Sequence, residues 1–410
     1  MSVQSFDLAA TYAAPLDVSI VMPCLNEIQS LPHCIANAQE ALREIERLYG
    51  LAGEIVIADN GSTDGSQALA AALGARVVPV VRRGYGAALI GGCGGAFGHY
   101  ILMGDADGSY DFTDGVAMIG ALIDGADLCM GSRFKGGIAP GAMPWKNRYI
   151  GNPALTGILN LFFRSGIDDA HCGLRAITKA AFETLGLSGS GMEFASEMVI
   201  KASLRQMRIA QAPATLSPDL RQRGPHLRPW RDGWRHLRYL LMLSPTWVFG
   251  VPALLAILSA ATILGIAALF ATGLIQGETP FGANWSILGG FLLTVGHFAA
   301  LMSVATHFYG VRRGYRRLRP WAGRLGSFLT LETALVSGCL LMGLSFAGFL
   351  LIGWSWSTHG FAAPTSVLPL TLAAACGTVG LQTVLGGFLL AIIADHNARL
   401  APSPGGPDHG

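Results

Sequence analysis

The chain has 410 residues, of which 51% are hydrophobic and 13% are charged, and its formal net charge is +2 at pH 7. Ordinary soluble domains carry about 25% charged residues, so this composition argues against a wholly soluble protein and indicates membrane segments. A net charge this small gives no reason to expect a nucleic-acid partner.

The beginning of the chain and its cysteines indicate the compartment. The sequence MSVQSFDLAATYAAPLD has no basic stretch followed by an apolar run, so we expect no signal peptide and a first domain that stays in the cytosol. The seven cysteines are scattered, with neither a CxxC pair nor a Cys/His ligand spacing. This pattern predicts reduced thiols rather than a disulfide framework or a zinc site.

Short apolar runs alternate with helical patterns in the first part of the chain. The runs predict strands at 17–23, 54–59, 76–81, 100–105 and 125–133. Helices are predicted at 28–50, 61–75 and 85–99, with Ser62 or Thr63 capping the second and Gly74 ending it. This alternation predicts an α/β domain with a mostly parallel, doubly wound sheet.

Polar residues follow four of the predicted strands, at Pro23–Glu27, Asp59–Ser62, Gly104–Asp107 and Gly131–Arg133. Ligands of doubly wound sheets bind at the carboxyl ends of the strands, so a ligand site is expected there. Asp105 and Asp107 repel each other unless something positive lies close. The pair is therefore either a solvated turn or a cation site.

The stretch 145–166 (WKNRYIGNPALTGILNLFFRSG) has apolar residues at helical spacing and basic residues near its ends. We expect an amphipathic helix lying on a bilayer. An internal core helix is the alternative.

Four later segments are long enough to span a bilayer, which takes about 20 apolar residues. They lie within 246–276, 285–309, 334–354 and 367–394. Arginines cluster before the first segment and between the second and third, whereas the other two loops have no Lys or Arg. This bias predicts a multi-pass protein of the cell (inner) membrane, with the first domain and both termini in the cytoplasm.

Four motifs, SIVMPCLNE, IVIADNGSTDGS, GDADGSYDF and DAHCGLRA, resemble in order and spacing those of the family 2 glycosyltransferases with a GT-A fold. They are similar above all to the polyprenyl-phosphate (dolichol-phosphate) hexose synthases, over roughly residues 17–240. The resemblance implies a Rossmann-like GT-A domain followed by an all-α domain of four transmembrane helices. The expected boundaries are 1–215 for the GT-A domain, 216–240 for a basic juxtamembrane segment, 241–396 for the membrane domain and 397–410 for a disordered tail.

The resemblance assigns the donor half of the site. Asp105 and Asp107 look like a DxD motif that holds Mg²⁺ or Mn²⁺ on the phosphates of a nucleotide sugar. Asp59 is implied to contact the base or ribose. The rest of the implied nucleotide-sugar pocket comprises Pro23, Leu25, Asn26, Glu27 and Ala106, together with Asp105. Ser109 stands where many relatives have glutamine, which leaves a third protein ligand open.

The resemblance also implies an acceptor half. Asp169–Arg175 is similar to the family's D-x-x-x-G-x-R element beside the acceptor phosphate, and Arg133 matches the arginine after the fifth strand. The implied catalytic residues are Asp169, Arg133 and Arg175; Asp169 is an orienting group, a base or an ion-pair partner of Arg175. A lipid phosphate is already ionised and needs positioning more than a base. Further phosphate contacts are expected from Arg223, His226 and Arg228.

Together with these observations, the resemblance implies inverting transfer of one hexose, from a GDP-mannose-type or UDP-glucose-type donor, to a polyprenyl phosphate at the cytoplasmic membrane face. A processive polysaccharide synthase is an alternative, but its Q-x-x-R-W motif is absent. A non-catalytic lipid-binding or translocating protein would not need the DxD motif, and a glycosyltransferase with a soluble acceptor is a further alternative. Whether the protein forms a homo-oligomer is left open.

Overall fold

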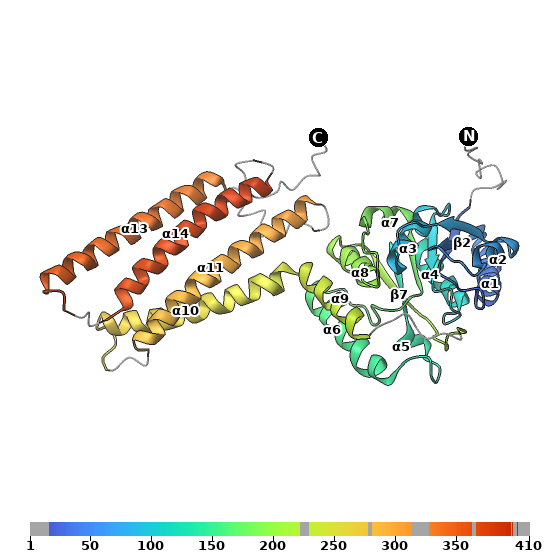
Figure 1. Cartoon of the computed structure of the whole chain (residues 1–410), viewed down its shortest axis with the longest axis horizontal. Helices are drawn as coiled ribbons and strands as arrows, with labels where there is room; N and C mark the ends of the chain where they lie inside the picture. Colours follow the sequence, from blue (N-terminus) through green and yellow to red (C-terminus); the bar gives the residue numbers. More distant parts are fainter. Residues whose placement is uncertain are drawn as a thin grey trace. The chain divides into compact units, whose positions relative to one another are not determined.

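The computed structural model describes residues 16–221, 229–277, 281–313, 316, 328–362, 366–394, 396 and 400. The chain divides into two compact units, Met1–Leu243 and Ser244–Gly410 (Figure 1). Each unit is described by itself.

The first unit is built on a seven-stranded sheet with the order β3-β2-β1-β4-β6-β5-β7. The strands are β1 (Val18–Cys24), β2 (Gly53–Asp59), β3 (Arg76–Pro79), β4 (Tyr100–Met103), β5 (Leu128–Ser132), β6 (Arg175–Thr178) and β7 (Ile209–Pro213). All neighbours pair in parallel except β6, which is antiparallel to β4 and β5. The predicted mostly parallel sheet is confirmed, and β6 and β7 are additions to it.

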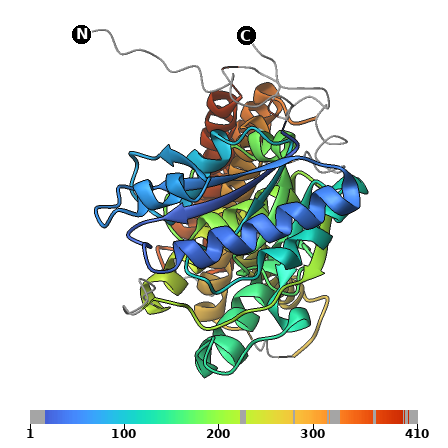
Figure 2. The same ribbon diagram turned by 90° about the vertical axis from the view of Figure 1, so that its right-hand side faces the viewer.

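Helices cover both faces of this sheet. They are α1 (Leu31–Tyr49), α2 (Ser66–Ala72), α3 (Tyr85–Gly94), α4 (Gly115–Ile123), α5 (Arg133–Gly136), α6 (Asn152–Phe163), α7 (Lys179–Leu185), α8 (Phe194–Leu204) and α9 (Pro229–Met242), with helical turns η2 (Phe112–Asp114) and η3 (Asn147–Gly151). Figure 2 shows α1, in blue, crossing in front of the strands. Alternate strand residues point to opposite faces: Ile20 belongs to the apolar cluster that includes α1 and α4, whereas Val21 belongs to the one that includes α3 and α8.

Local sequence explains where α1 begins and ends. Proline stands in its first turn, where a missing N–H costs nothing. Six buried apolar residues recur every three or four positions along it: Leu31, Cys34, Ile35, Ala38, Ala41 and Ile45. Gly50 ends the helix with φ +71°, a left-handed conformation that glycine adopts without strain.

The expected cap of α2 is wrong. The helix begins at Ser66 after Gly65, which makes no side-chain capping bond. The Ser62 hydroxyl instead accepts a hydrogen bond from the Asn26 N–H at 2.9 Å, and the Thr63 N–H donates to Asn26 Oδ1 at 2.8 Å. Both residues therefore join two loops at the sheet edge rather than starting a helix.

Residues 145–166 are largely helical, comprising η3 and α6. Within α6 only Thr156 and Leu159 are buried. Large apolar side chains on this stretch are exposed: Trp145, Tyr149, Ile150 and Leu161. The stretch is thus a two-sided helix with an uncovered apolar surface in this structure.

The second unit confirms the four predicted apolar helices. Its candidate spans are Thr246–Ala271, Ala283–Arg312, Leu331–Thr358 and Leu368–Ile393. The first span comprises the turn η4 (Thr246–Gly250) and helix α10 (Val251–Ala271), and the others are α11 (Ala283–Arg312), α13 (Leu331–Thr358) and α14 (Leu368–Ile393). By length and composition each is able to cross a bilayer.

Small residues and polar contacts hold these helices together. A Cβ on Gly380 of α14 would lie 2.7 Å from the Gly338 oxygen of α13, so the two backbones approach closely, as in other membrane bundles. Between α11 and α14, His297 Nδ1 lies 2.9 Å from Gln382 Oε1. The membrane helices therefore pack through backbone proximity and a polar pair rather than through bulky side chains alone.

Candidate active site

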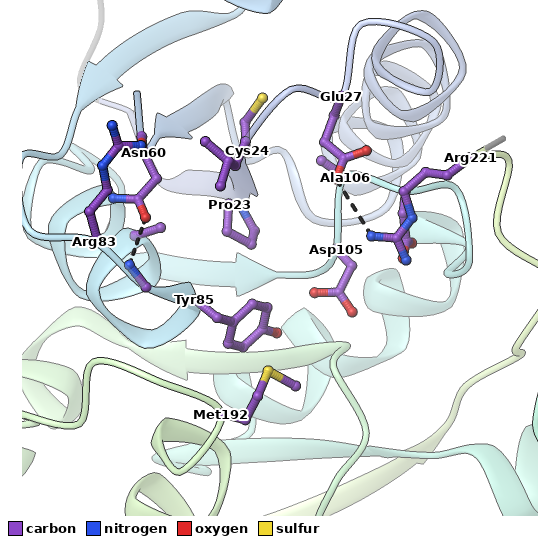
Figure 3. A pocket seen from close by; sticks show the side chains of 14 residues that line it. Pro23, Cys24, Glu27, Asn60, Arg83, Tyr85, Asp105, Ala106, Met192 and Arg221 are labelled. Atoms are coloured by element: carbon purple, nitrogen blue, oxygen red, sulfur yellow. Dashed lines mark hydrogen bonds and ion pairs between the residues drawn. The ribbon is translucent and has the colours of Figure 1, made fainter. Parts of the chain in front are cut away.

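The carboxyl ends of β1 and β2, together with the loop after β4, surround a cavity of about 380 Å³ in the first unit (Figure 3). It is lined by Pro23, Cys24, Leu25, Glu27, Asn60, Arg83, Gly84, Tyr85, Ala88, Asp105, Ala106, Asp107, Met192 and Arg221. Parallel pairing of β1 with β2 and β4 brings these chain ends to one edge of the sheet. The cavity lies where a doubly wound sheet is expected to bind its ligand.

Asp105 points into this cavity from the loop after β4 (Figure 3). Its Oδ1 is buried without a hydrogen-bond partner among the described residues. Burial and, next, the charge of Asp107 raise the pKa of Asp105 to about 7, while the Tyr85 hydroxyl hydrogen-bonds the carboxylate and opposes the rise. An acceptor oxygen is thus held at the cavity, and no donor from the described part of the chain satisfies it.

Asp107 has a different environment. Its Oδ1 accepts hydrogen bonds from Ser109 Oγ at 2.6 Å and from the Ser109 N–H at 3.0 Å. Its Oδ2 forms an ion pair with Arg221 at 2.7 Å. The serine that replaces the family's glutamine therefore orients the second aspartate.

The residues predicted to bind the nucleotide divide into two groups. Five line the cavity: Pro23, Leu25, Glu27, Asp105 and Ala106. Asp59 and Asn26 are not among the lining residues. The Asp59 carboxylate accepts from Gln67 Nε2 at 2.6 Å and from the Gly61 N–H at 2.9 Å, so its polar contacts here organise the loop after β2.

Asn60, which follows Asp59, holds the loop at residues 80–84, which forms part of another wall of the cavity. Its Nδ2 donates to the carbonyls of Val80 and Arg82, at 3.0 and 2.7 Å, and its Oδ1 accepts from the Gly84 N–H at 2.7 Å. These bonds set the loop that presents Arg83 and Tyr85 to the cavity.

In the predicted acceptor loop, Asp169 is paired with Arg133. Arg133 Nε and Nη2 bind the two oxygens of Asp169 at 2.6 and 2.8 Å. Asp169 is fully buried and Arg133 is 7% exposed. The alternative of an ion pair between Asp169 and Arg175 is not what the structure shows, because both carboxylate oxygens bind the Arg133 guanidinium.

Arg175 holds the same loop through its backbone. Its guanidinium donates to three carbonyl oxygens, those of Cys172 at 2.7 Å, Ala195 at 2.7 Å and Ala170 at 3.1 Å. With 2% of its surface exposed, it lies outside the cavity lining and stabilises the turn that precedes β6. In this arrangement its contacts are structural.

The acceptor loop and the DxD loop meet at Gly173. A Cβ on this residue would lie 2.7 Å from Asp105 Oδ2 and 2.8 Å from the Tyr110 ring. The Gly173 N–H donates to the Tyr110 hydroxyl at 2.8 Å. Only a residue without a side chain leaves room for Asp105 here, which gives a physical reason for the glycine in DAHCGLRA.

Eight lining residues were not among the predicted site residues: Cys24, Asn60, Arg83, Gly84, Tyr85, Ala88, Met192 and Arg221. The glycines on both sides of Tyr85 were a weak signal for the loop that carries Arg83 and Tyr85. Met192 and Arg221 lie far along the chain from Asp107, and no local pattern marks them. The predicted phosphate contacts Arg223, His226 and Arg228 lie outside the described residues.

The two aspartates fit a divalent cation that shares its coordination with a ligand. Among the described residues no group of three or more His, Cys, Asp and Glu side chains gathers to hold a metal. Mg²⁺ is usually bound through one or two carboxylates plus substrate phosphates, and the unpartnered Asp105 Oδ1 is an oxygen that a cation would satisfy. The residues therefore suit a metal that enters with a phosphorylated substrate.

Comparison with known proteins gives two family matches. Residues 19–186 match the family model for glycosyl transferase family 2, and residues 304–394 match the C-terminal transmembrane region of family 2 glycosyltransferases. The low-salt glycan biosynthesis hexosyltransferase Agl6 of Haloferax volcanii is 35% identical over 387 residues, which cover 92% of this chain and 89% of that protein.

Other relatives match somewhat more than half of this chain. The dolichol-phosphate mannosyltransferase of Pyrococcus furiosus is 27% identical over 234 residues, covering 56% of this chain and 64% of that protein. Among solved structures, glucosyl-3-phosphoglycerate synthase of Mycobacterium tuberculosis, in complex with Mg²⁺ and UDP, matches 56% of this chain and 79% of its own. Its identity is 21% and its TM-score 0.44.

Proposed function

The chain belongs to glycosyltransferase family 2, and we propose that it transfers one hexose from a nucleotide sugar to a polyprenyl phosphate at the cytoplasmic face of a membrane. The protein is a glycosyltransferase with membrane-spanning C-terminal helices. The donor, the acceptor and the sidedness are the proposed part.

One observation carries the proposal: the DxD loop and the acceptor loop are in contact. Asp105, at the nucleotide cavity, lies against Gly173 of the loop that contains Asp169. A donor phosphate on Asp105 and Asp107 would therefore lie close to whatever the acceptor loop binds. Proximity of the two reactants is the main requirement when the nucleophile is already charged.

The reaction is a displacement at the anomeric carbon of the sugar. An oxygen of the lipid phosphate forms the new bond to this carbon, and the bond to the nucleoside diphosphate breaks, so that the diphosphate leaves with the electron pair. Inversion at this carbon is implied by the family. No proton has to be removed from an ionised phosphate, which agrees with the engagement of both Asp169 oxygens by Arg133.

Asp105 and Asp107 are the residues that would hold Mg²⁺ or Mn²⁺. When bound, the metal neutralises the charge of the leaving diphosphate. Ser109 and Tyr85 orient the two carboxylates through the hydrogen bonds described above. The protein's own contribution here is the placement of two oxygens at the cavity.

The rest of the chain supports a lipid acceptor. The apolar surface of Trp145, Tyr149, Ile150 and Leu161 suits the boundary of a bilayer. The P. furiosus and Mycolicibacterium smegmatis relatives are named dolichol-phosphate mannosyltransferase and polyprenol monophosphomannose synthase. The arginine-rich loops favour a cytoplasmic site, where nucleotide sugars are made.

Transfer in vitro tests the proposal. Purified full-length protein in vesicles with polyprenyl phosphate is incubated with a panel of labelled nucleotide sugars, and lipids are extracted. We expect one labelled monosaccharide on the lipid fraction with at least one donor, and none with Asp107→Asn. Label in a polymer would indicate a processive synthase, and label only in the aqueous phase would indicate a soluble acceptor; either result overturns the proposal.

A further inference from the structure

Two arginines line the cavity among the described residues, and their partners differ (Figure 3). Arg83 donates to the backbone carbonyls of Asn60 and Gly61. Among the described residues, the terminal nitrogens of Arg221 contact carboxylates: Asp107 at 2.7 Å, Asp219 at 3.0 Å and Glu27 at 3.5 Å. One of the two cationic side chains is therefore bound to an aspartate of the DxD motif.

The backbone before Arg221 is fixed against the DxD loop. The Leu220 N–H donates to the Asp107 carbonyl at 2.9 Å, and the Ser217 N–H donates to the Ser109 carbonyl at 2.9 Å. Gly108, with φ +79°, allows Leu220 to pack so closely that a Cβ there would lie 2.6 Å from Leu220 Cδ1. Arg221 is thus directed to Asp107 by a paired backbone, and its side chain is 17% exposed.

We propose that Arg221 is a built-in counter-ion of the metal site, which occupies Asp107 when no metal is bound and which the metal must displace. This inference rests on the proposed function, because it assumes that Asp105 and Asp107 hold a divalent cation. It goes further by assigning a residue that competes with the metal.

Charge explains the competition. Asp107 Oδ1 is already held by Ser109, so Oδ2 is the oxygen left for a cation, and Arg221 occupies it. A divalent cation on the same oxygen would be repelled by the guanidinium at close range. If Arg221 moves away, Glu27 and Asp219 also lose a positive partner. The Arg221 guanidinium therefore weakens binding of the metal alone. When a diphosphate binds together with the metal, the negative charge of the diphosphate compensates for the guanidinium.

The experiment measures binding of Mn²⁺ alone to full-length protein in detergent, by the electron paramagnetic resonance signal of free Mn²⁺. The test variant is Arg221→Gln, and Arg221→Ala replaces it if that protein does not fold. Arg83→Gln is the matched control, because it removes a cavity arginine that contacts backbone oxygens only. Binding that remains in Asp107→Asn is subtracted as non-specific.

We expect Arg221→Gln to bind Mn²⁺ about tenfold more tightly than the unaltered protein, the order of effect of one nearby charge in a partly solvated site. Arg83→Gln should bind as the unaltered protein does, and Arg221→Lys, which keeps the charge, should stay within about threefold of it. Equal or weaker Mn²⁺ binding by Arg221→Gln overturns the proposal. So does an equal gain in Arg83→Gln, which would indicate a general charge effect.

The transfer assay separates this inference from the proposed function. If lipid-linked hexose forms but Arg221→Gln and the unaltered protein bind Mn²⁺ equally, only the counter-ion role is wrong. If no lipid-linked hexose forms with any donor, the proposed function fails, and the Mn²⁺ comparison still decides the role of Arg221.

Discussion

Individual side chains at the cavity are arranged for ligand binding at the expense of stability. Asp105 keeps a buried oxygen that has no partner within the described ranges, and an unsatisfied polar group of this kind costs about 1–3 kcal/mol. The spacing of Asp105 and Asp107 in the sequence was enough to single out these two aspartates as a candidate cation site. Their partners Tyr85 and Arg221 were not predicted, because only the folded chain brings them to the two carboxylates.

Asp107→Asn should abolish most of the transfer while the protein stays folded. The substitution keeps the size of the side chain but removes the charge that a divalent cation needs. A loss of about a hundredfold or more in turnover is expected, since metal assistance contributes several kcal/mol. Asp124→Asn, a change of the same kind at an exposed position, is the control. Turnover that is near normal in Asp107→Asn, or in excess EDTA, contradicts the metal assignment.

Asp105→Asn should stabilise the metal-free protein at alkaline pH. The folded-state pKa of Asp105, about 7, lies above its ordinary value of 3.8, so folding favours the protonated carboxyl. The stability that this group contributes is fully present below pH 3.8 and is lost as the pH rises from there to about 7. We therefore expect the variant to melt a few degrees higher than the unaltered protein at about pH 8, and the difference to shrink steadily as the pH falls towards 3.8. Thermal unfolding in EDTA measures this; a lower Tm for the variant at about pH 8 is the contrary result.

Among the elements, strands and helices with a strong apolar pattern were predictable, and short or unusual ones were not. Strands β1, β2 and β4 are apolar runs that end in polar motifs, so their pattern is unambiguous. Strand β6 has four residues, two of them polar, and its antiparallel pairing comes from the fold around it. The predicted cap of α2 was wrong because Ser62 and Thr63 hydrogen-bond with Asn26, which lies more than 30 positions earlier in the chain.

Gly173→Ala tests the contact between the two loops. A Cβ would lie 2.7 Å from Asp105 Oδ2, so either the carboxylate or the loop must move. We expect weaker Mn²⁺ binding and a loss of turnover of about tenfold or more, since a shift of about 1 Å in a positioned group has effects of this order. Gly157→Ala on α6, where no atom lies within 4 Å of the added carbon, is the matched control. A Gly173→Ala protein with unaltered turnover would show that the loops do not depend on each other.

The entire chain combines a glycosyltransferase unit with a unit of membrane-spanning helices. Every lining residue of the cavity, and the Asp169–Arg175 loop, precedes Leu243, where the first unit ends. The sequence predicted both parts, because hydropathy and the alternation of strands and helices are strong signals over long stretches. The sequence motifs located the site but not the pairing of Asp169 with Arg133, which depends on how the loop after α6 folds back on β5.

Truncation after Leu243 should separate binding from transfer. The shortened protein is expected to bind nucleotide and Mn²⁺ within about threefold of the full chain, because the cavity is complete. Transfer to a long-chain lipid phosphate in vesicles should collapse, since the phosphate is no longer presented within about 3–3.5 Å of the sugar carbon. Transfer to a short, soluble prenyl phosphate should suffer less. Equal losses on the two acceptors, with nucleotide binding intact, would mean that the membrane helices shape the catalytic site itself.

The chemical identity of the acceptor is the central claim, and a comparison of two lipids tests it most directly. Full-length protein in vesicles receives a labelled nucleotide sugar that it accepts, with either a polyprenyl phosphate or the polyprenol of the same chain length, and the lipid product is identified by mass spectrometry. The account predicts that the polyprenyl phosphate gains a single hexose on its phosphate and keeps its own phosphate ester. It predicts no product from the polyprenol. A hexose on the polyprenol at a comparable rate, or a chain of several sugars on either lipid, would contradict it.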